Sequence, residues 1–288
     1  MNNFLVSISV ITYNQEEYIR NTLDNIIAQK VAFPIEIVVG DDCSTDNTRS
    51  ICIEYKNKYP NIIQLHLHEK NMGSMANWIS NINLCQGKYI AICEGDDYWT
   101  DPYKLQKQVD LMESHSDFSM CAHASQILMC DHFDECKIDK SVLTTEDLID
   151  EDWGIMTASI LFRKDMLDMP DWYGKVKNGD YALQLLLSLK GNIGYLPDNM
   201  SVYRQHFGGV SASLKPLNQT AWIVFLLDEF NKYTNGKFRK LIIARIKRIY
   251  KKQIYYAKGY GLRKAALVLK FYQLLTPFAP FLIKSLRK

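Results

Sequence analysis

The chain has 288 residues, of which 47% are hydrophobic and 23% charged, and this composition excludes a disordered or low-complexity protein. The length suffices for one large domain, or a domain with an appendage, that buries a sizeable core. The chain has seven cysteines, an odd number, and no Cys-x-x-Cys motif. This pattern favours reduced thiols in a cytosolic compartment. We expect no signal peptide, and no uncharged run reaches the roughly 18 residues that a membrane-spanning helix requires.

Charge is distributed very unevenly along the chain. All 32 acidic residues precede Gly236, whereas 15 of the 34 Lys and Arg residues follow it. The small formal net charge of +2 therefore hides an acidic body and a strongly basic tail.

Apolar, β-rich runs alternate with segments of helical spacing over the first hundred residues. We expect strands at 5–11, 35–39, 62–67 and 88–93, and helices at 17–29, about 45–58 and 74–84. Strands that alternate with helices predict an α/β fold with a mostly parallel sheet. Because ligands bind beyond the carboxyl ends of such strands, polar residues that follow a strand are candidate site residues.

The second part of the chain gives weaker signals. The pattern predicts helices at 102–113 and 180–190, strands at 118–129, 157–162 and 194–196, and a polar, loop-rich segment at 131–150 with a short helix near 145–149. Residues 203–213 are polar and contain glycine, so we expect a mobile loop there. From residue 219 onward the pattern is helical.

Three carboxylates, Glu94, Asp96 and Asp97, follow the apolar run 89–93. Aspartates can be chosen for turn geometry alone, and a solvated turn is the simplest interpretation. Three carboxylates within four residues repel one another and lose hydration, however, so a compensating cation is the better explanation. Oxygen ligands without a neighbouring histidine pair favour Mg²⁺ or Mn²⁺ over zinc.

Two further polar groups follow the first and second predicted strands. Thr12, Tyr13 and Asn14 could form a simple turn or a platform on which Tyr13 stacks against a nucleobase. Asp41 and Asp42 could serve an Asx turn and helix cap or accept hydrogen bonds from a base or ribose. Both interpretations stay open when each group is considered alone.

Four segments, taken together, resemble one known family. They are Ser9–Asn14, Val38–Thr48, Asn71–Gly73 with Asn77, and Gln86–Asp97. In this order they resemble the nucleotide-binding half of family 2 glycosyltransferases of GT-A fold, over roughly residues 7–113, and a looser resemblance continues to about residue 213. The resemblance implies a Rossmann-like, mostly parallel sheet flanked by helices. It also implies an inverting, metal-dependent hexosyl- or N-acetylhexosaminyl-transferase that uses a nucleoside diphosphate sugar, often UDP-linked.

The resemblance assigns roles to the polar groups. Thr12 and Asp42 would hold the base and ribose with support from Asp41, and Asp96 would match the metal-binding aspartate of the family's D-x-D signature. Glu94 stands where the first aspartate of that signature is usual, and Cys43 replaces a common glycine. The expected contacts to the nucleotide sugar are Thr12, Tyr13, Asn14, Asp41, Asp42, Asn71, Gly73, Glu94, Asp96 and Arg204, and the expected metal ligands are Asp96, Asp97 and His206.

Asp180, within Asn178–Tyr181, is the candidate catalytic base. An aspartate that begins a predicted helix is simply a cap when considered in isolation. The family carries its catalytic base at this point, often as Glu-Asp, and Gly179 takes the place of that glutamate here. A carboxylate is needed because the attacking sugar hydroxyl is a poor nucleophile.

Tyr203–His206 resembles a Tyr-Arg-x-His segment of the family. It is either a solvated surface loop or a lid from which Arg204 reaches the diphosphate and His206 completes the metal shell. The Gln-x-x-Arg-Trp motif of processive synthases is absent, so we expect one sugar per encounter. The aromatic residues Trp153, Trp172 and Tyr173 belong either to the core or to an acceptor site. The Cys and His residues between Cys121 and Cys136 fit no standard zinc spacing.

The basic tail, residues 237–288, mixes Lys and Arg with apolar residues at near-helical spacing. It could pack on the body as a solvated extension, and nucleic-acid binding is disfavoured because no reading motif accompanies the charge. A basic amphipathic helix on an anionic membrane fits best, with residues 267–283 dipping into the interface without spanning it. We therefore expect a cytoplasmic protein, peripheral on the inner membrane face.

The sequence thus predicts a catalytic domain over residues 1–213, with a nucleotide-sugar-binding half (1–113) and an acceptor-binding half (114–213), followed by a helical basic extension (214–288). The predicted acceptor is a saccharide or lipid-linked hydroxyl in surface polysaccharide synthesis. Two alternatives stay open. A sugar-nucleotide nucleotidyltransferase would need a Gly-rich, basic phosphate loop after the first strand, which residues 12–17 lack. An inactive membrane-bound scaffold would need no metal.

Overall fold

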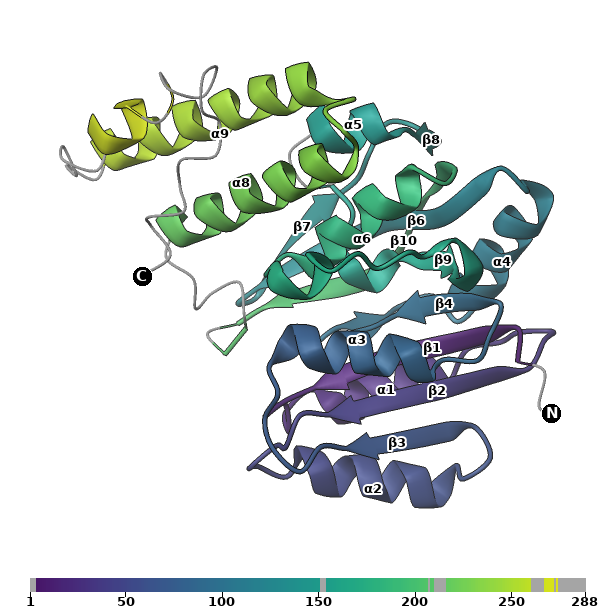
Figure 1. Cartoon of the computed structure of the whole chain (residues 1–288). Coiled ribbons are helices and arrows are strands. Elements are labelled where there is room, and N and C mark those ends of the chain that lie inside the picture. Colours follow the sequence, from purple (N-terminus) through teal and green to yellow (C-terminus); the bar gives the residue numbers. More distant parts are fainter. Residues whose placement is uncertain are drawn as a thin grey trace. The chain divides into compact units, whose positions relative to one another are not determined.

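The computed structural model describes residues 4–150, 154–206, 208–209, 216–259, 267–271 and 273. These residues fall into two compact units, whose elements are labelled in Figure 1. The first unit lies within Met1–Thr144, Trp153–Met169 and Leu186–His206, and the second within Thr145–Asp152, Pro170–Leu185 and Phe207–Lys288.

The first unit is built on one mixed sheet. Its strands are β1 (Val6–Thr12), β2 (Ile35–Asp41), β3 (Ile63–Leu67), β4 (Tyr89–Ile92), β5 (Tyr98–Trp99), β6 (Phe118–Met129), β7 (His132–Cys136), β8 (Val142–Leu143), β9 (Leu161–Arg163) and β10 (Asn192–Gln205). The order is β3-β2-β1-β4-β9-β6-β10-β5, with β7 beside β6 and β8 beside β10. The ladders among β1 to β4 and the long β6–β10 ladder are parallel, and the remaining ladders are antiparallel. The predicted α/β fold with its βαβ units is confirmed.

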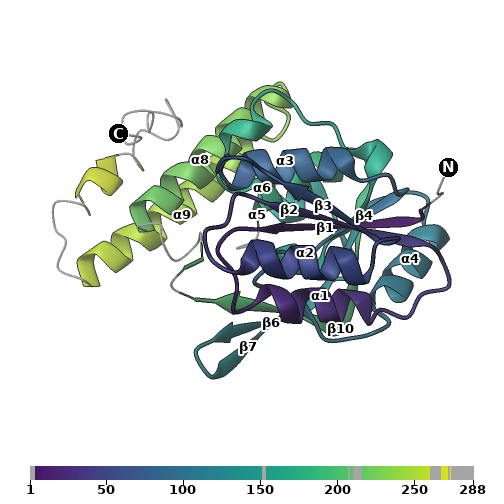
Figure 2. The same ribbon diagram turned by 90° about the horizontal axis from the view of Figure 1, so that it is seen from below.

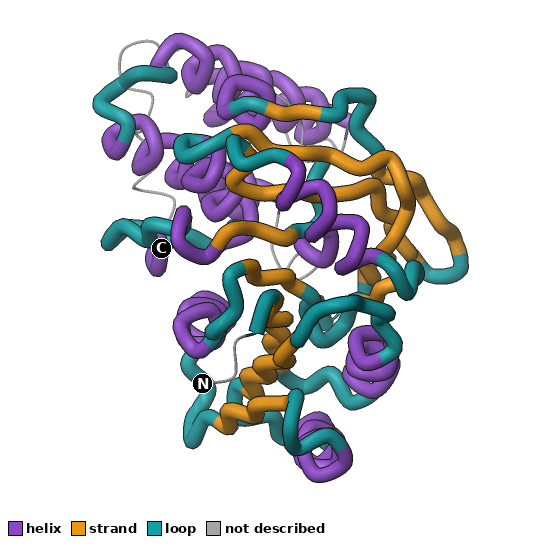
Figure 3. Tube along the Cα trace, turned by 90° about the vertical axis from the view of Figure 1, so that its right-hand side faces the viewer, coloured by secondary structure: helices purple, strands orange, loops and turns teal. Residues whose placement is uncertain are grey.

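Four helices pack in the first unit, namely α1 (Ile19–Ile27), α2 (Thr48–Lys58), α3 (Ser74–Leu84) and α4 (Lys104–Ser114). Figure 2 shows α3 on one face of the β1–β3 strands and α1 and α2 on the other. Figure 3, seen from the side, shows the same strands between helices. This parallel part of the sheet is therefore covered on both faces, as parallel strands require.

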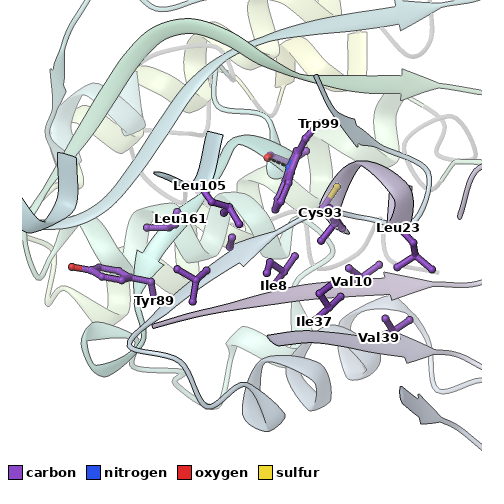
Figure 4. Packing of buried hydrophobic residues seen from close by; sticks show 14 of the residues in the cluster. Ile8, Val10, Leu23, Ile37, Val39, Tyr89, Cys93, Trp99, Leu105 and Leu161 are labelled. Atoms are coloured by element: carbon purple, nitrogen blue, oxygen red, sulfur yellow. Dashed lines mark hydrogen bonds between the residues drawn. The ribbon is translucent and has the colours of Figure 1, made fainter. Parts of the chain in front are cut away.

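The core on the α1 side follows from the two-residue period of the strands. Ile8 and Val10 of β1 point to the same face and are fully buried there. Leu23, on the apolar stripe of α1, belongs to the same cluster, as do Ile37 and Val39 of β2 (Figure 4). Each such side chain stabilises the fold by up to about 1.5–3 kcal/mol through burial.

The α3 face of the sheet carries a polar layer instead. Asn81 donates through Nδ2 to the carbonyl of Val38 at 2.9 Å, and Asn77 donates to the carbonyl of Gly40 at 2.9 Å. A Cβ on Gly40 would lie 2.5 Å from Oδ1 of Asn77, so only glycine allows this approach. The two amides thus fix α3 against the strand ends.

Three predictions for the second part of the chain are wrong. β10 runs to Gln205, and residues 203–205 pair with Ile127–Met129 of β6 rather than forming a loop. Register shifts between Leu196 and Ser201 break the alternation that identifies a strand from sequence. Residues 132–136 form β7, and 157–159 form a 3₁₀ turn before β9. Residues 207 and 210–213 of the predicted loop lie outside the described residues.

The second unit is helical. It contains α5 (Thr145–Asp150), most of α6 (Gly179–Ser188), α8 (Pro216–Tyr233) and α9 (Arg239–Gly259). Helices α8 and α9 pack side by side (Figure 1), and the Phe230 and Phe238 rings stack with centroids 5.9 Å apart. Gly236, at φ 77°, ends α8 and donates its N–H to the carbonyl of Asn231 at 2.8 Å. Of the residues 219–259, for which a helical pattern was predicted, 219–233 and 239–259 are helical and a turn at 234–238 separates them.

Candidate functional site

An acidic turn follows β4 at the carboxyl edge of the sheet. We call Glu94–Asp97 the acidic lip. Its Gly95 N–H donates to the carbonyl of Ile11 at 2.9 Å, and its Asp97 N–H donates to the carbonyl of Glu94 at 3.0 Å. One ligand oxygen from each of Glu94, Asp96 and Asp97 lies within 4.8 Å of the others, and among the described residues this is the one such group of three acidic, His or Cys side chains. The predicted carboxylate cluster is therefore formed.

Asp97 is the least hydrated member of the lip. Its side chain is fully buried, and burial, followed by the charges of Asp96 and Glu94, raises its pKa well above the usual range. Oδ1 accepts the backbone N–H of Arg204 at 3.0 Å. Oδ2 is buried and has no hydrogen-bond partner among the described residues. A divalent cation with oxygen preference fits this donor set, because it would satisfy Oδ2 and offset the repulsion.

The end of β10 brings Arg204 and His206 to the lip. Arg204 donates through a guanidinium N–H to the carbonyl of Asp96 at 2.7 Å, and the guanidinium lies 4.2 Å from the ring centroid of Tyr98. His206 Nε2 lies 3.0 Å from Oδ2 of Asp96, and this hydrogen bond raises the pKa of His206. Sequence reasoning placed both residues near the lip but anticipated neither the strand that carries them nor the aromatic ring under Arg204.

The two aspartates at the end of β2, Asp41 and Asp42, hold neighbouring loops. Asp41 is fully buried and pairs with Nε of Arg49 at 2.7 Å. Asp42 accepts the N–H of Met72 at 2.7 Å and of Gly73 at 2.9 Å on its two oxygens. Gly73 adopts φ 87°, a conformation that favours glycine. Asn71 also donates to the carbonyl of Asp42, at 3.3 Å, so the predicted residues 42, 71 and 73 do lie together.

The loop after β1 is tied to the loop after β2. Asn14, at φ 51°, accepts the N–H of Thr45 on Oδ1 at 2.8 Å and donates its own N–H to Oγ of Ser44 at 3.0 Å. Thr12 donates through its hydroxyl to Gln15 at 2.7 Å. Tyr13 is 43% exposed, so its ring is available to a ligand. The predicted residues after the first three parallel strands thus share one edge with the lip.

Several residues that hold the site in place were not identified from the sequence. Arg49 lies eight positions after its partner Asp41, and Thr22 and Asn21 lie on α1, which carried only a core pattern. Thr22 donates its hydroxyl to lip carbonyls, and Asn21 accepts from Arg204. Such residues contact the backbone or another side chain of the site, so their type alone does not identify them.

Asp180 lies in the second unit, in the first turn of α6. The turn is held by the hydroxyl of Tyr173, which donates to the carbonyl of Gly179 at 3.1 Å. Tyr173 is fully buried and Trp172 is 8% exposed, so the core interpretation of these aromatics holds. Trp153 lies outside the described residues.

Comparison with known proteins gives consistent results. Residues 7–168 match the sequence model of a family described as glycosyl transferase family 2. An uncharacterised protein of Mycobacterium tuberculosis is 36% identical over 209 residues, which make up 71% of this chain and 60% of that protein. This chain thus spans less than two thirds of that relative's length. A putative teichuronic acid biosynthesis glycosyltransferase of Bacillus subtilis, TuaG, is 29% identical over 236 residues, 78% of this chain and 89% of that protein.

Two solved structures are similar in fold. S. aureus TarS, residues 1–349 in complex with UDP-GlcNAc, superposes with a TM-score of 0.63 at 17% identity and covers 86% of this chain and 81% of its own. The mannosyltransferase PcManGT from Pyrobaculum calidifontis, in complex with GDP-Man and Mn²⁺, gives a TM-score of 0.59 at 15% identity, with 97% and 82% covered. At these identities the likeness establishes the fold and confirms the predicted GT-A architecture.

Proposed function

This chain belongs to glycosyl transferase family 2, and we propose that it transfers a sugar from a nucleoside diphosphate sugar to a hydroxyl of a saccharide or lipid-linked acceptor in surface polysaccharide synthesis. The relative named for teichuronic acid biosynthesis supports a role in polysaccharide synthesis. The similar structure solved with UDP-GlcNAc supports a UDP-linked donor, and a hexosyl or N-acetylhexosaminyl group is the proposed cargo.

The acidic lip carries this proposal. Asp96 and Asp97, with His206, would hold Mn²⁺ or Mg²⁺, and Glu94 would contact the nucleotide sugar beside them. A divalent cation bound there would neutralise the charge that develops on the departing nucleoside diphosphate. Oδ2 of Asp97 supports this role. It is buried and has no hydrogen-bond partner among the described residues, so without a cation nothing compensates the free-energy cost of removing this oxygen from water.

The loops after β1 and β2 would bind the nucleoside. Tyr13 would stack on the base beside Asn14, and Thr12 and Asp42 would hold the base and ribose with support from the buried Asp41. Both carboxylates also have structural partners and so hold the loops of this site in place, and Asn71 and Gly73 lie on the loop that is bound to Asp42. Arg204 would add a positive charge near the diphosphate. Residues 1–113, with Arg204 and His206, would thus bind the donor, and the rest of 114–213 would bind the acceptor.

Transfer would proceed by one displacement, with inversion at the anomeric carbon. The acceptor oxygen forms the new bond to that carbon as the bond to the diphosphate oxygen breaks, and the diphosphate leaves with the electron pair. Asp180 is the proposed base that takes the acceptor's hydroxyl proton. No covalent intermediate on the chain is needed for this stereochemistry.

A thermal-shift panel of UDP and GDP sugars, with and without Mn²⁺, tests the proposal. We expect one donor to raise the melting temperature only when the metal is present, because ligand binding to the native state stabilises it. Asp96→Ala should remove that shift and the turnover. A nucleotidyltransferase would instead respond to a nucleoside triphosphate with a sugar phosphate, and an inactive scaffold would respond to none of these ligands.

We further propose that the basic tail binds an anionic membrane surface. Tyr255 of α9 is 76% exposed, and Leu267 and Phe271 are 68% and 59% exposed, on a segment rich in Lys and Arg. No described helix is both long and apolar enough to span a membrane. Cosedimentation with anionic and neutral vesicles tests this, using Lys251→Glu/Lys252→Glu, two exposed positions of α9. Equal binding of this variant and the unaltered chain to anionic vesicles would contradict the proposal.

A further inference from the structure

Thr22 of α1 lies directly beneath the acidic lip. We infer that Thr22 is a positioning residue for the lip: its hydroxyl fixes the peptide carbonyls on both sides of Asp96 and so sets where the carboxylates point. This inference rests on the proposed function, because it concerns the cation that the lip would hold. Thr22 itself would touch neither the cation nor the sugar.

The contact is short and fully buried. Thr22 has no exposed surface, and its Oγ1 lies 2.6 Å from the carbonyl oxygen of Asp97 and 2.9 Å from that of Gly95. A hydroxyl has one proton, and the two lip carbonyls share it in a three-centre hydrogen bond, since the third nearby acceptor, the carbonyl of Tyr18 one turn earlier in α1, is more distant at 3.4 Å. Removal of the donor would leave the carbonyl of Gly95 without this side-chain donor and that of Asp97 with only the weak thiol donor of Cys93, at 3.8 Å, so the turn would have to move to regain a full hydrogen bond.

The carbonyl of Asp96, which lies between these two, accepts a hydrogen bond from Arg204. The Arg204 side chain is itself bound to α1, through Asn21. Arg204 donates to the carbonyl of Asp96 at 2.7 Å and, through its other terminal nitrogen, to Oδ1 of Asn21 at 2.7 Å. Adjacent residues of α1, Asn21 and Thr22, therefore control three successive carbonyls of the lip. Thr22 acts directly on two of them, and Asn21 acts on the third by orienting the guanidinium.

The lip has little freedom on its other side. A Cβ on Gly95 would lie 2.8 Å from Oγ1 of Thr12 and 2.4 Å from Oε1 of Gln15, so the turn is packed closely against the loop after β1. Three mutually repelling carboxylates push such a turn open. A donor fixed on a rigid helix opposes that movement and keeps the ligand oxygens preorganised for a cation.

The test compares Mn²⁺ affinity among variants of the full chain, with free Mn²⁺ counted by its electron paramagnetic resonance signal, in the presence and absence of UDP. Thr22→Val keeps the shape and removes the donor, and we expect it to bind Mn²⁺ about ten-fold more weakly, as loss of an outer-shell partner typically does. Thr22→Ser restores the hydroxyl and should recover most of the affinity. Ile26→Val, a buried truncation on the same helix that removes no hydrogen-bond donor, is the matched stability control and should bind as the unaltered chain does.

Asn21→Ala provides a second test of the inference if Thr22→Val does not fold. Asn21 is exposed, so we expect this variant to fold. We expect about three-fold weaker Mn²⁺ binding, since one hydrogen bond to the guanidinium is lost. If the unaltered chain binds Mn²⁺ but Thr22→Val binds it equally well, or no worse than Ile26→Val, the inference is wrong and the proposed function stands. The same holds if Thr22→Val does not fold and Asn21→Ala binds normally. If the unaltered chain binds no Mn²⁺, the proposed function itself fails.

Discussion

The backbone N–H of Arg204 donates to Oδ1 of Asp97 at 3.0 Å and joins two residues that lie 107 positions apart. The bond satisfies one oxygen of a carboxylate that is fully buried, while the other oxygen has no partner among the described residues. In the metal-free protein, Asp97 is therefore a cost to stability that a bound cation would offset.

Asp97→Asn should separate metal binding from stability. The amide oxygen can still accept the Arg204 N–H, and the negative charge is removed from a buried place beside Asp96 and Glu94. We expect the metal-free variant to be more stable by on the order of 1 kcal/mol in urea unfolding with a chelator present. Its Mn²⁺ binding should be lost. A less stable variant, or one that binds Mn²⁺ normally, would contradict this account of Asp97.

Cys43→Gly should stabilise the protein. Cys43 adopts φ 62° in the turn after β2, a left-handed conformation that costs about 1–2 kcal/mol for a residue with a Cβ. Glycine removes that cost but loses more chain entropy on folding, so a net gain of about 0.5–1 kcal/mol is expected. Thermal melting measures it. Cys43→Ala keeps the Cβ and serves as control, and an equal gain in that variant would show that the thiol rather than the backbone matters.

Lys104 should make stability rise with pH. Its side chain is fully buried, Nζ donates to Oε1 of Gln108 at 2.7 Å, and burial lowers the lysine pKa to about 7. In the unfolded chain the pKa is about 10.4. Between these values the unfolded state binds more protons than the native state, so the free energy of unfolding grows with pH, by up to about 1.4 kcal/mol per unit.

Lys104→Met isolates this contribution. Urea unfolding at several pH values between 7 and 9 should show a rise for the unaltered chain and a flatter profile for the variant, because methionine carries no proton to lose. The difference between the two profiles cancels other titrating groups. Parallel profiles would mean that Lys104 stays charged in the core, where the Trp99 ring lies 4.0 Å from Nζ.

Asp180→Asn should keep donor binding and lose transfer. If Asp180 is the base, turnover should fall by roughly 10²–10⁴-fold, while stabilisation by the donor with Mn²⁺ is unchanged. Asp180 could also stabilise α6 itself, because a carboxylate in the first turn interacts favourably with the positive end of the helix dipole. Glu146→Gln, in the first turn of α5 in the same unit, removes that effect alone and is the matched control. Intact transfer in Asp180→Asn would remove the residue from the mechanism.

The sequence predicted the parallel half of the sheet well, because β1 to β4 are rich in Ile, Val and Leu and are separated by helices of recognisable period. The carboxyl ends of those strands also located Thr12, Asp42 and the lip, since parallel strands bring their ends to one edge. β10 was mostly missed because register shifts around Asn199 interrupt its alternation. Arg49 and Thr22 were missed because they act on partners distant in sequence through one hydrogen bond or ion pair, which leaves no local pattern.

The pairing of β5 with β10 limits how this protein can be recombined with its homologues. Tyr98 and Trp99, directly after the lip, pair with Val202 and Ser201, and this is the one ladder of β5 in the described part of the chain. In a chimera that joins residues 1–113 to the rest of a homologue, β5 would therefore lack its partner strand β10. Asp97 would also lose the N–H of Arg204 as a hydrogen-bond donor. We expect an exchange between homologues to transfer the preference for a sugar donor only when the exchanged segments include β10, residues 192–205, together with residues 1–113.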